Sequence, residues 1–295
     1  MKTPQAFIVL SLLAGLWACT PSNETIATPT INTATPIPLA TPTSTPIPPS
    51  PTPTPITCLT EPGHVEQDSI TTIKPAQEFL IYLPPCYDEF NDKRYPVLYL
   101  LHGQTYIDDQ WVRIGAADVA NRLIISGESP PFIIVFPDDR YWNLPPGPGF
   151  GDRLINLVIP YVDENYRTLD DRAHRALGGL SRGGGWTVRL GFNHPELFSA
   201  IGLHSPAIFK EDAPSIDKWI HAISEDMRPN LWLDIGDSDK ELGYVQLLET
   251  TLANNNYFYE FHVYSGDHTE RYWRLHVEEY LRWYASNWTE QVNNP

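Results

Sequence analysis

Residues 174–193 read HRALGGLSRGGGWTVRLGFN, and this stretch decides the fold. Its first part is typical of a strand and its last part of a helix, with five glycines around Ser181 at the junction. Residues 179–183 match the pattern G-x-S-x-G, which between a strand and a helix forms a sharp turn that exposes the serine hydroxyl. The alternatives are a plain glycine-rich loop and a phosphate-binding loop, but no lysine follows the glycines as the latter requires. The stretch therefore predicts a nucleophilic Ser181 on a strand-to-helix turn.

Short apolar runs alternate with longer helical patterns on both sides of this stretch. Such alternation predicts an α/β fold with helices on both faces of a mostly parallel sheet. Continuous apolar runs such as VLYLL and FIIVF are typical of strands buried on both faces. We expect strands at 78–83, 97–101, 132–136, 173–180, 200–204, 231–235 and 257–264, and helices at 111–126, 153–165, 184–193, 241–253 and 270–286.

A nucleophilic serine needs a base, and the base needs an orienting acid. In α/β-hydrolases these follow along the chain in the order serine, acid, histidine. His268, in SGDHTERYW, comes after the last expected strand and before the last expected helix, so it is the expected base. Asp237 and Asp239 both lie on the loop after LWLDIG, and the pattern alone leaves the acid open between them.

The negative charge that forms on the ester oxygen needs two fixed N–H donors, which together make an oxyanion hole. One is expected from the backbone of Arg182, directly after the nucleophile. The other is expected from the backbone of Gln104, which follows His102-Gly103 at the end of a strand. We interpret His102 itself as a turn residue rather than a second base.

Three side chains are candidates for the substrate pocket. Tyr141 and Trp142, in FPDDRYWNLPPGPGFGD, are able to stack on a sugar or an aromatic acyl group. A loop packed by its own aromatic residues explains them equally well. His204, which ends the strand after the glycine-rich turn, is a third candidate, with a position in the core as the alternative.

The first 57 residues differ in composition from a folded domain. Lys2 and the apolar run that follows form a signal sequence, too short to span a bilayer as a mature helix. It ends in LWAC, which resembles a lipobox, so residues 1–19 are expected to be a lipoprotein-type signal with Cys19 as the lipidated residue. An ordinary secretory signal is the alternative. Residues 20–57 are rich in proline and threonine and are expected to form a disordered linker, with a single folded domain at 58–295.

Cysteine usage and charge limit the chemistry further. If Cys19 carries the lipid, Cys58 and Cys86 remain, and in an exported protein they are expected to form a disulfide rather than two buried thiols. No Cys-x-x-Cys or paired-histidine spacing indicates a metal. A net charge of −16 argues against a nucleic-acid partner, which would need clustered lysine and arginine. Membrane contact is expected only through the lipid anchor.

Four blocks of the sequence resemble the putative esterase family of α/β-hydrolases, which includes esterase D-type enzymes, feruloyl and acetyl-xylan esterases, enterochelin esterases and mycolyltransferases. The blocks are YPVLYLLHG, IPYVDENYRT, GGLSRGGGWTVRLGFNHPELFSAIGLHSPA and SGDHTERYWRLHVEEYL, in the family's order. The resemblance implies Ser181 as nucleophile and His268 as base, and the family's usual G-x-x-D spacing selects Asp239 as the acid. Arg182 replaces a commoner methionine or other apolar residue and Gln104 a frequent glycine, which alters the pocket lining but removes no backbone donor.

These observations together predict an exported serine esterase that needs no cofactor. The expected substrate is a small-molecule or polysaccharide-linked ester of carbohydrate-linked, aryl or siderophore type. Acyl transfer to an alcohol, as in mycolyltransferases, is one alternative. A catalytically silent carbohydrate-binding protein on the same fold is the other, since a fold by itself implies no activity.

Overall fold

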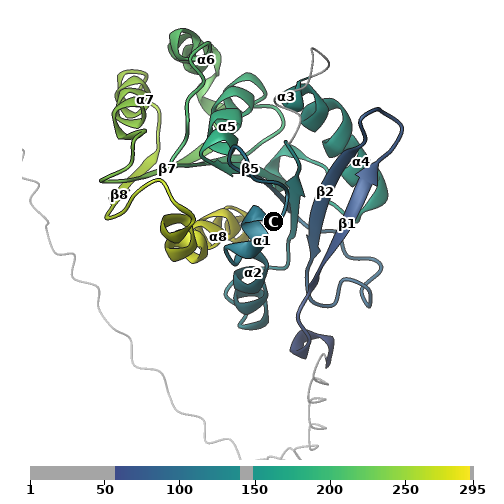
Figure 1. Ribbon diagram of the computed structural model, residues 1–295. Helices are drawn as coiled ribbons and strands as arrows, with labels where there is room; N and C mark the ends of the chain where they lie inside the picture. The colour runs from purple at the N-terminus through teal and green to yellow at the C-terminus, as the bar shows by residue number, and fades with distance from the viewer. Residues whose placement is uncertain (1–56, 140–148, 293–295) are drawn as a thin grey trace, which may run out of the picture. The chain divides into compact units, whose positions relative to one another are not determined.

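The computed structural model describes residues 57–139 and 149–292, and these residues form a sheet with helices on both faces (Figure 1). The sheet has eight strands in the order β1-β2-β4-β3-β5-β6-β7-β8. The six strands β3 to β8 are parallel to one another. β2 pairs antiparallel with both β1 and β4. The expected mostly parallel sheet is confirmed. The strands are β1 (His64–Ile70), β2 (Gln77–Leu83), β3 (Val97–Leu101), β4 (Ile133–Pro137), β5 (Arg175–Leu180), β6 (Ala200–His204), β7 (Asn230–Gly236) and β8 (Glu260–Tyr264).

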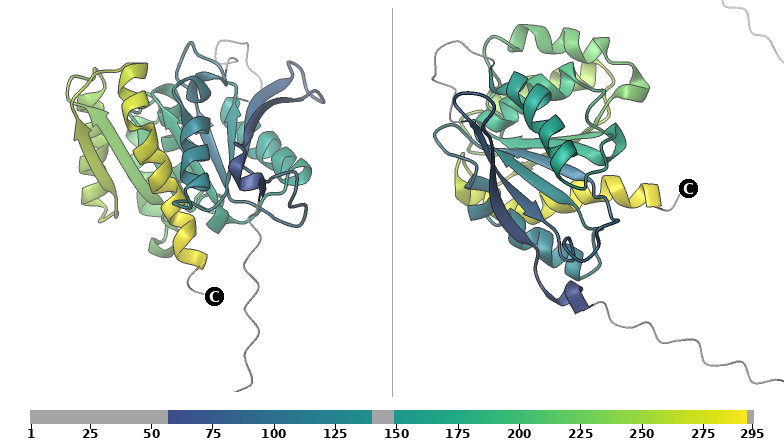
Figure 2. Two further views of the ribbon diagram at one scale, coloured as in Figure 1. Left: turned by 90° about the horizontal axis from the view of Figure 1, so that it is seen from below. Right: turned by 90° about the vertical axis from the view of Figure 1, so that its right-hand side faces the viewer.

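The helices cover the two faces in separate groups (Figures 1 and 2). α1, α2 and α8 pack on one face, and α3 to α7 pack on the other. Alternate side chains of a buried strand point to opposite faces, so the continuous apolar run of β3 contributes to both cores. The helices are α1 (Gln110–Arg113), α2 (Ala116–Ile125), α3 (Phe150–Arg153), α4 (Ile159–Asn165), α5 (Arg182–Asn193), α6 (Ile216–Ala222), α7 (Leu242–Asn254) and α8 (Glu270–Val292).

Two expected helices are interrupted. The helix expected at 111–126 is divided into α1 and α2 by Gly115, whose φ of 105° lies in the left-handed region. The helix expected at 153–165 begins earlier, at Phe150, and contains a π-helical turn at Leu154–Val158 before α4.

The sequence patterns also misplace the limits of some elements. β5 and β8 begin later than expected, at Arg175 and Glu260, and a 3-10 turn at Arg172–His174 precedes β5. β1 was not expected at all, because its sequence HVEQDSI is largely polar and most of its side chains stay partly exposed at the edge of the sheet. The short α6 was not expected either.

The structure contains the expected disulfide between Cys58 and Cys86. It joins the 3-10 turn Thr57–Thr60, where the described domain begins, to the loop that follows β2. The bond therefore ties the entry of the domain to the antiparallel edge of the sheet.

Replacing both Cys58 and Cys86 by serine is expected to lower the free energy of unfolding by about 3 to 4 kcal/mol, from the loop-closure entropy of the 28-residue separation. Urea unfolding of the purified, oxidised protein measures this value. Wild-type protein unfolded with a reductant present should match the double variant. Unchanged unfolding midpoints in both cases would show that the bond contributes nothing.

Candidate active site

Ser181 lies on a strained turn between β5 and α5. Its backbone has φ 52° and ψ −118°, a conformation that non-glycine residues rarely adopt. The two glycines of the pattern allow the turn to close: a Cβ on Gly179 would lie 2.3 Å from the carbonyl carbon of Gly183, and one on Gly183 would lie 2.2 Å from the Leu101 oxygen. The serine side chain is thereby presented at the carboxyl end of the parallel strands.

His268 contacts both Ser181 and Asp239. The loop between β8 and α8 places its Nε2 atom 2.8 Å from Ser181 Oγ. Its Nδ1 atom lies 2.8 Å and 3.0 Å from the two carboxylate oxygens of Asp239. The Trp273 ring packs edge-on against the imidazole, with centroids 5.1 Å apart. A serine, an imidazole and a carboxylate thus lie in one hydrogen-bonded row.

The Asp239 carboxylate is held in its charged form. Burial alone would raise the pKa of Asp239, but hydrogen bonds from His268 and from the Glu241 amide, at 2.8 Å, together lower it below its usual value. An ionised carboxylate only accepts hydrogen bonds, so it favours the tautomer of His268 that carries a proton on Nδ1. In that tautomer Nε2 is free to accept the proton of Ser181.

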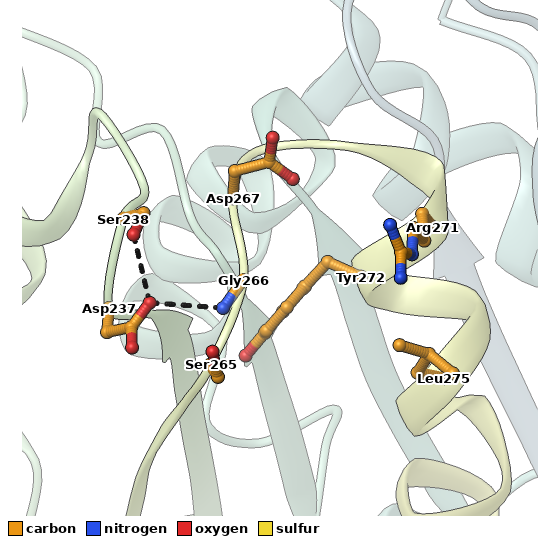
Figure 3. Close-up of a pocket in the computed structure, with 8 residues that line it drawn as sticks. All are labelled: Asp237, Ser238, Ser265, Gly266, Asp267, Arg271, Tyr272 and Leu275. Carbon is orange, nitrogen blue, oxygen red and sulfur yellow. Dashed lines mark hydrogen bonds between the residues drawn. The ribbon is translucent and has the colours of Figure 1, made fainter.

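Asp237, the other candidate acid, lines a neighbouring pocket of about 380 Å³, and His268 is not among the residues that line it (Figure 3). Its Oδ1 atom accepts hydrogen bonds from the Gly266 amide and the Ser238 hydroxyl, both at 3.1 Å. These bonds, the one from Gly266 foremost, lower the pKa of Asp237. The structure therefore brings Asp239, and not Asp237, to the histidine.

A larger pocket of about 580 Å³ opens over Ser181 and His268. The loop after β3 lines one side, including Gln104 and Tyr106, and the first turn of α8 lines another. Pockets of this size hold small organic ligands. Trp273 and Tyr106 contribute aromatic surface to it.

The two expected oxyanion donors lie at the ends of neighbouring strands. Gln104 follows the end of β3 and lines the pocket. Arg182 is the first residue of α5 and directly follows Ser181. β3 and β5 pair in parallel, with Leu101 opposite Gly179, so the residues that follow each strand are brought together beside Ser181.

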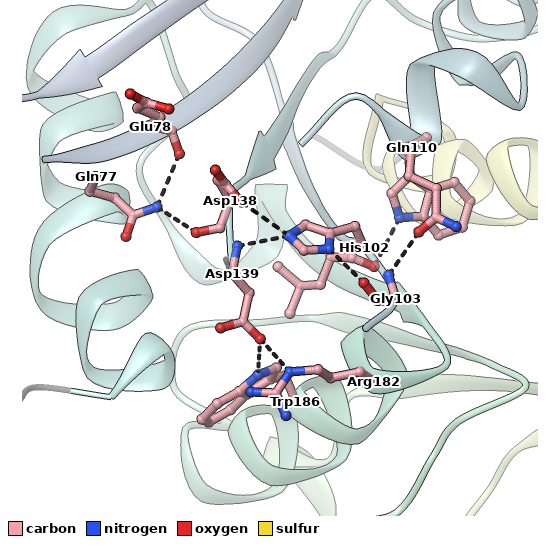
Figure 4. A network of polar contacts seen from close by, with 11 residues as sticks. Gln77, Glu78, His102, Gly103, Gln110, Asp138, Asp139, Arg182 and Trp186 are labelled. Carbon is pink, nitrogen blue, oxygen red and sulfur yellow. Dashed lines mark hydrogen bonds and ion pairs between the residues drawn. The ribbon is translucent and has the colours of Figure 1, made fainter. Parts of the chain in front are cut away.

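Asp139, a residue that the sequence left without a role, makes a buried ion pair with Arg182 (Figure 4). Its Oδ2 atom accepts hydrogen bonds from Arg182 Nε and Trp186 Nε1, both at 2.7 Å. Burial raises the pKa of Asp139, although Arg182 beside it acts in the opposite direction. Forty-three residues separate this pair along the chain, and no local pattern links them.

The prediction that His204 lines the pocket is wrong. The residue is fully buried beneath α8, where its Nδ1 atom lies 2.7 Å from Asp234 Oδ1 and its ring stacks on Tyr280 at 3.8 Å. The last residue of β6 points to the face that α8 covers, and not toward Ser181. Three further predicted residues, Cys19, Tyr141 and Trp142, lie outside the described part of the chain.

Asp234 ties the sheet to α8 through a buried hydrogen-bond network. Besides His204, its carboxylate accepts bonds from Tyr272 and Tyr280, both at 2.8 Å, and from Trp232 at 3.0 Å. Burial raises the pKa of both tyrosines, so both hydroxyls remain protonated donors. Because α8 begins two residues after His268, the bonds that hold α8 to Asp234 also restrain the position of the His268 loop.

Replacing Asp234 by alanine is expected to lower the free energy of unfolding by about 3 to 5 kcal/mol, because four buried donors lose their shared acceptor. Chemical denaturation measures the change. The matched control is Asp118→Ala, which removes an exposed carboxylate from the first turn of α2 and should cost at most about 1 kcal/mol. Equal stabilities of the two variants would contradict the role of the network.

None of the described helices is long and apolar enough to cross a membrane. Within residues 57–139 and 149–292, no three histidine, cysteine, aspartate or glutamate side chains gather in a group able to hold a metal ion.

Comparison with known sequences shows that this chain is similar to esterases. The sequence profile of the family described as Putative esterase matches residues 71–284. An endo-1,4-beta-xylanase/feruloyl esterase of Xylanibacter ruminicola is 35% identical over 136 residues, which are 42% of this chain and 19% of that protein. An esterase of Mycobacterium tuberculosis is 30% identical over 157 residues, 49% of this chain and 32% of that one. The chain thus spans about a fifth to a third of the length of these curated relatives.

Solved structures share the fold over most of the domain. A ferulic acid esterase superimposes with a TM-score of 0.70 at 27% identity, covering 77% of this chain and all of that one (100%). The fluorophosphonate-binding serine hydrolase F of Staphylococcus aureus gives a TM-score of 0.65 at 20% identity, covering 76% of this chain and 99% of that one. The second likeness is one of fold alone.

Proposed function

Because the chain belongs to the putative esterase family, we propose that it hydrolyses carboxylic esters through an acyl-enzyme formed on Ser181. One observation carries the proposal. His268 lies between a serine hydroxyl and a buried carboxylate, 2.8 Å from each. This is the arrangement that converts a weakly nucleophilic hydroxyl into an attacking group.

In the proposed mechanism, Ser181 Oγ attacks the ester carbonyl while His268 Nε2 takes its proton. Asp239 keeps the Nδ1 proton in place and stabilises the imidazolium that forms. The amides of Gln104 and Arg182 donate to the oxyanion of the tetrahedral intermediate. Collapse of the intermediate expels the alcohol, which receives the proton from Nε2. A water molecule then attacks the acyl-enzyme by the same steps and releases the acid.

The substrate we propose is a carbohydrate ester of an aromatic acid, of the feruloyl type. The names of two relatives support this class: the Xylanibacter ruminicola xylanase/feruloyl esterase and the solved ferulic acid esterase. The aromatic lining by Tyr106 and Trp273 suits an aryl group. An acetyl ester of a sugar, which needs no aromatic surface, is the comparison substrate.

Two measurements test this function. A fluorophosphonate probe should label the wild-type protein at Ser181, as read by peptide mass spectrometry. A panel of feruloyl, acetyl and short-chain esters should then identify the preferred acyl group. A protein that neither reacts with the probe nor hydrolyses any ester of the panel would be a binding protein on an esterase fold.

We also propose that the enzyme is exported and anchored through Cys19, with residues 20–57 as the spacer to the domain. The support is the LWAC sequence at 16–19 followed by the proline- and threonine-rich segment. Residues 1–56 lie outside the described part of the chain, so this remains a proposal from the sequence.

Replacing Cys19 by serine is expected to remove the lipid and shift the protein from the membrane fraction to the soluble fraction or to the unprocessed precursor. Fractionation and intact-mass spectrometry of the exported protein measure both effects. Wild-type protein without a lipid, distributed like the variant, would leave ordinary secretion as the explanation for the signal sequence.

A further inference from the structure

Asp139 connects the two strand ends that carry the expected oxyanion donors (Figure 4). It follows β4, and its backbone amide donates to His102 Nε2 at 2.7 Å, just beyond the end of β3. Its carboxylate holds Arg182 and Trp186 in the first turns of α5. In the sheet, β3 lies between β4 and β5. Asp139, on the loop that follows β4, therefore reaches both the end of β3 and α5, the helix that follows β5.

The imidazole of His102 fixes the direction of the Gln104 N–H group. A backbone amide can only donate, so His102 Nε2 accepts from Asp139, and Nδ1 is the ring nitrogen that donates. From there it donates to the Gly103 carbonyl oxygen at 2.8 Å. That carbonyl and the Gln104 N–H belong to one peptide unit, and a planar trans peptide directs the two groups to opposite sides. The ring therefore turns this N–H away from itself.

The peptide unit before it is fixed as well. The Gly103 amide donates to Gln110 Oε1 at 2.8 Å, and Gln110 is fully buried in α1. Its side-chain amide in turn donates to Glu270, at the start of α8, at 3.2 Å. The segment that carries the first oxyanion donor is thus held from both sides.

The carboxylate of Asp139 restrains the second donor. The Arg182 side chain is 18% exposed and that of Asp139 only 3%. The guanidinium also lies over the rings of Trp186 and Phe209, with its central carbon 5.7 Å and 5.5 Å from their centroids. Asp139 Oδ2 accepts from Arg182 Nε and from Trp186 Nε1, both at 2.7 Å, and these two bonds hold the guanidinium against the first turns of α5. The backbone N–H of Arg182 belongs to the residue that this arrangement fixes.

We propose that Asp139 is a positioning residue for ester hydrolysis, which aligns the N–H groups of Gln104 and Arg182 by holding His102 through its amide and Arg182 through its carboxylate. The inference rests on the proposed function. Donors stabilise an oxyanion best when they are oriented before the charge develops. A misaligned hole should therefore lower kcat and leave KM nearly unchanged.

The experiment compares Asp139→Asn and Arg182→Met with the wild type. Both variants keep the backbone amide of residue 139, so they test the carboxylate and guanidinium. Each should lose about 10- to 100-fold in kcat on an aryl ester, less than the 10²–10³ lost with a whole donor. KM should stay within about threefold. The double variant should lose no more than the more impaired single variant, because the two groups act as one pair.

An arylboronic acid supplies a second measurement that a general loss of stability would not change. Ser181 Oγ bonds to the boron, which becomes a tetrahedral anion like the reaction intermediate. This anion depends on the oxyanion donors, whereas the neutral carbonyl of a bound ester does not. The inhibition constant should rise by the same factor by which kcat falls.

Arg189→Met is the matched control. Arg189 lies on the same helix and over the same two rings, at 5.0 Å from Trp186 and 4.8 Å from Phe209, but it pairs with Asp212 at 2.7 Å. Its kcat should stay within about twofold of the wild type, because its partner does not contact the His102 loop.

The outcomes separate the two proposals. Wild-type protein inactive on every ester would reject the proposed function. An active wild type whose Asp139→Asn and Arg182→Met variants keep kcat and boronate affinity within about twofold, or change KM instead, would overturn the positioning role. If melting curves show that Asp139→Asn does not fold, Arg182→Met decides the question by the same criteria.

Discussion

Replacing Ser181 by alanine is expected to lower kcat on an activated aryl ester by about 10⁶-fold, the loss found when the nucleophile of a serine-protease triad is removed. Without Oγ no acyl-enzyme forms, and His268 at 2.8 Å has no proton to accept from the protein. Only the oxyanion donors and the binding pocket remain, and these alone give a residual acceleration over water of about 10³–10⁴.

Stopped assays with a p-nitrophenyl ester measure the loss, with melting temperatures to confirm the fold. Ser238→Ala is the matched control: Ser238 is exposed on the loop that carries Asp239 and bonds to Asp237, so its removal should change kcat by less than about twofold. Ser181→Ala protein that retained more than about 1% of wild-type kcat would mean that hydrolysis uses another nucleophile.

Replacing Asp239 by asparagine is expected to lower kcat by about 10²–10⁴-fold while the protein stays folded. The asparagine amide would present N–H groups to His268 Nδ1, which now lies 2.8 Å from a carboxylate oxygen. The imidazole would then carry its proton on Nε2, the atom that must accept the serine proton.

Asp237→Asn, the isosteric change two residues earlier, should cost less than about tenfold, since that carboxylate bonds the Gly266 amide and not the histidine. Combining Asp239→Asn with Ser181→Ala should add little to the loss from Ser181→Ala alone, because members of a triad act as a unit. An impaired Asp237→Asn beside an active Asp239→Asn would reverse the assignment of the acid and leave the serine mechanism intact.

The ionised state of Asp239 also has a consequence for pH. Its pKa is lower in the folded protein than in the unfolded chain, so its contribution to stability is complete above the ordinary carboxyl pKa and is lost only as pH falls through the lowered value. The stability difference between the wild type and Asp239→Asn should therefore shrink as the pH falls below the ordinary carboxyl pKa of about 4.

The sequence by itself determined the features that depend on neighbouring residues. β3 and β6 have the predicted bounds, because strands buried on both faces are continuous apolar runs. Ser181 was placed on its turn because strand, glycines and helix follow one another within twenty residues of sequence. The disulfide followed from two remaining cysteines in a chain that the sequence predicts to be exported. The edge strand β1 was not predicted, because a polar, half-exposed strand has no apolar pattern in its sequence.

Only the tertiary structure decided which side chains meet. The loop after β7 carries two aspartates, and the β8–α8 loop packs against it. In this packing Asp239 contacts His268, while Asp237 accepts a hydrogen bond from the Gly266 amide. Whether His204 faces the pocket or the core depends on which face of the sheet α8 covers, which no local pattern records. The bond from Asp139 to His102 spans 37 residues and that to Arg182 spans 43. Such contacts arise because parallel strands far apart in sequence end at one edge of the sheet, so the chemistry of that edge is set by strand order and not by the sequence around any one residue.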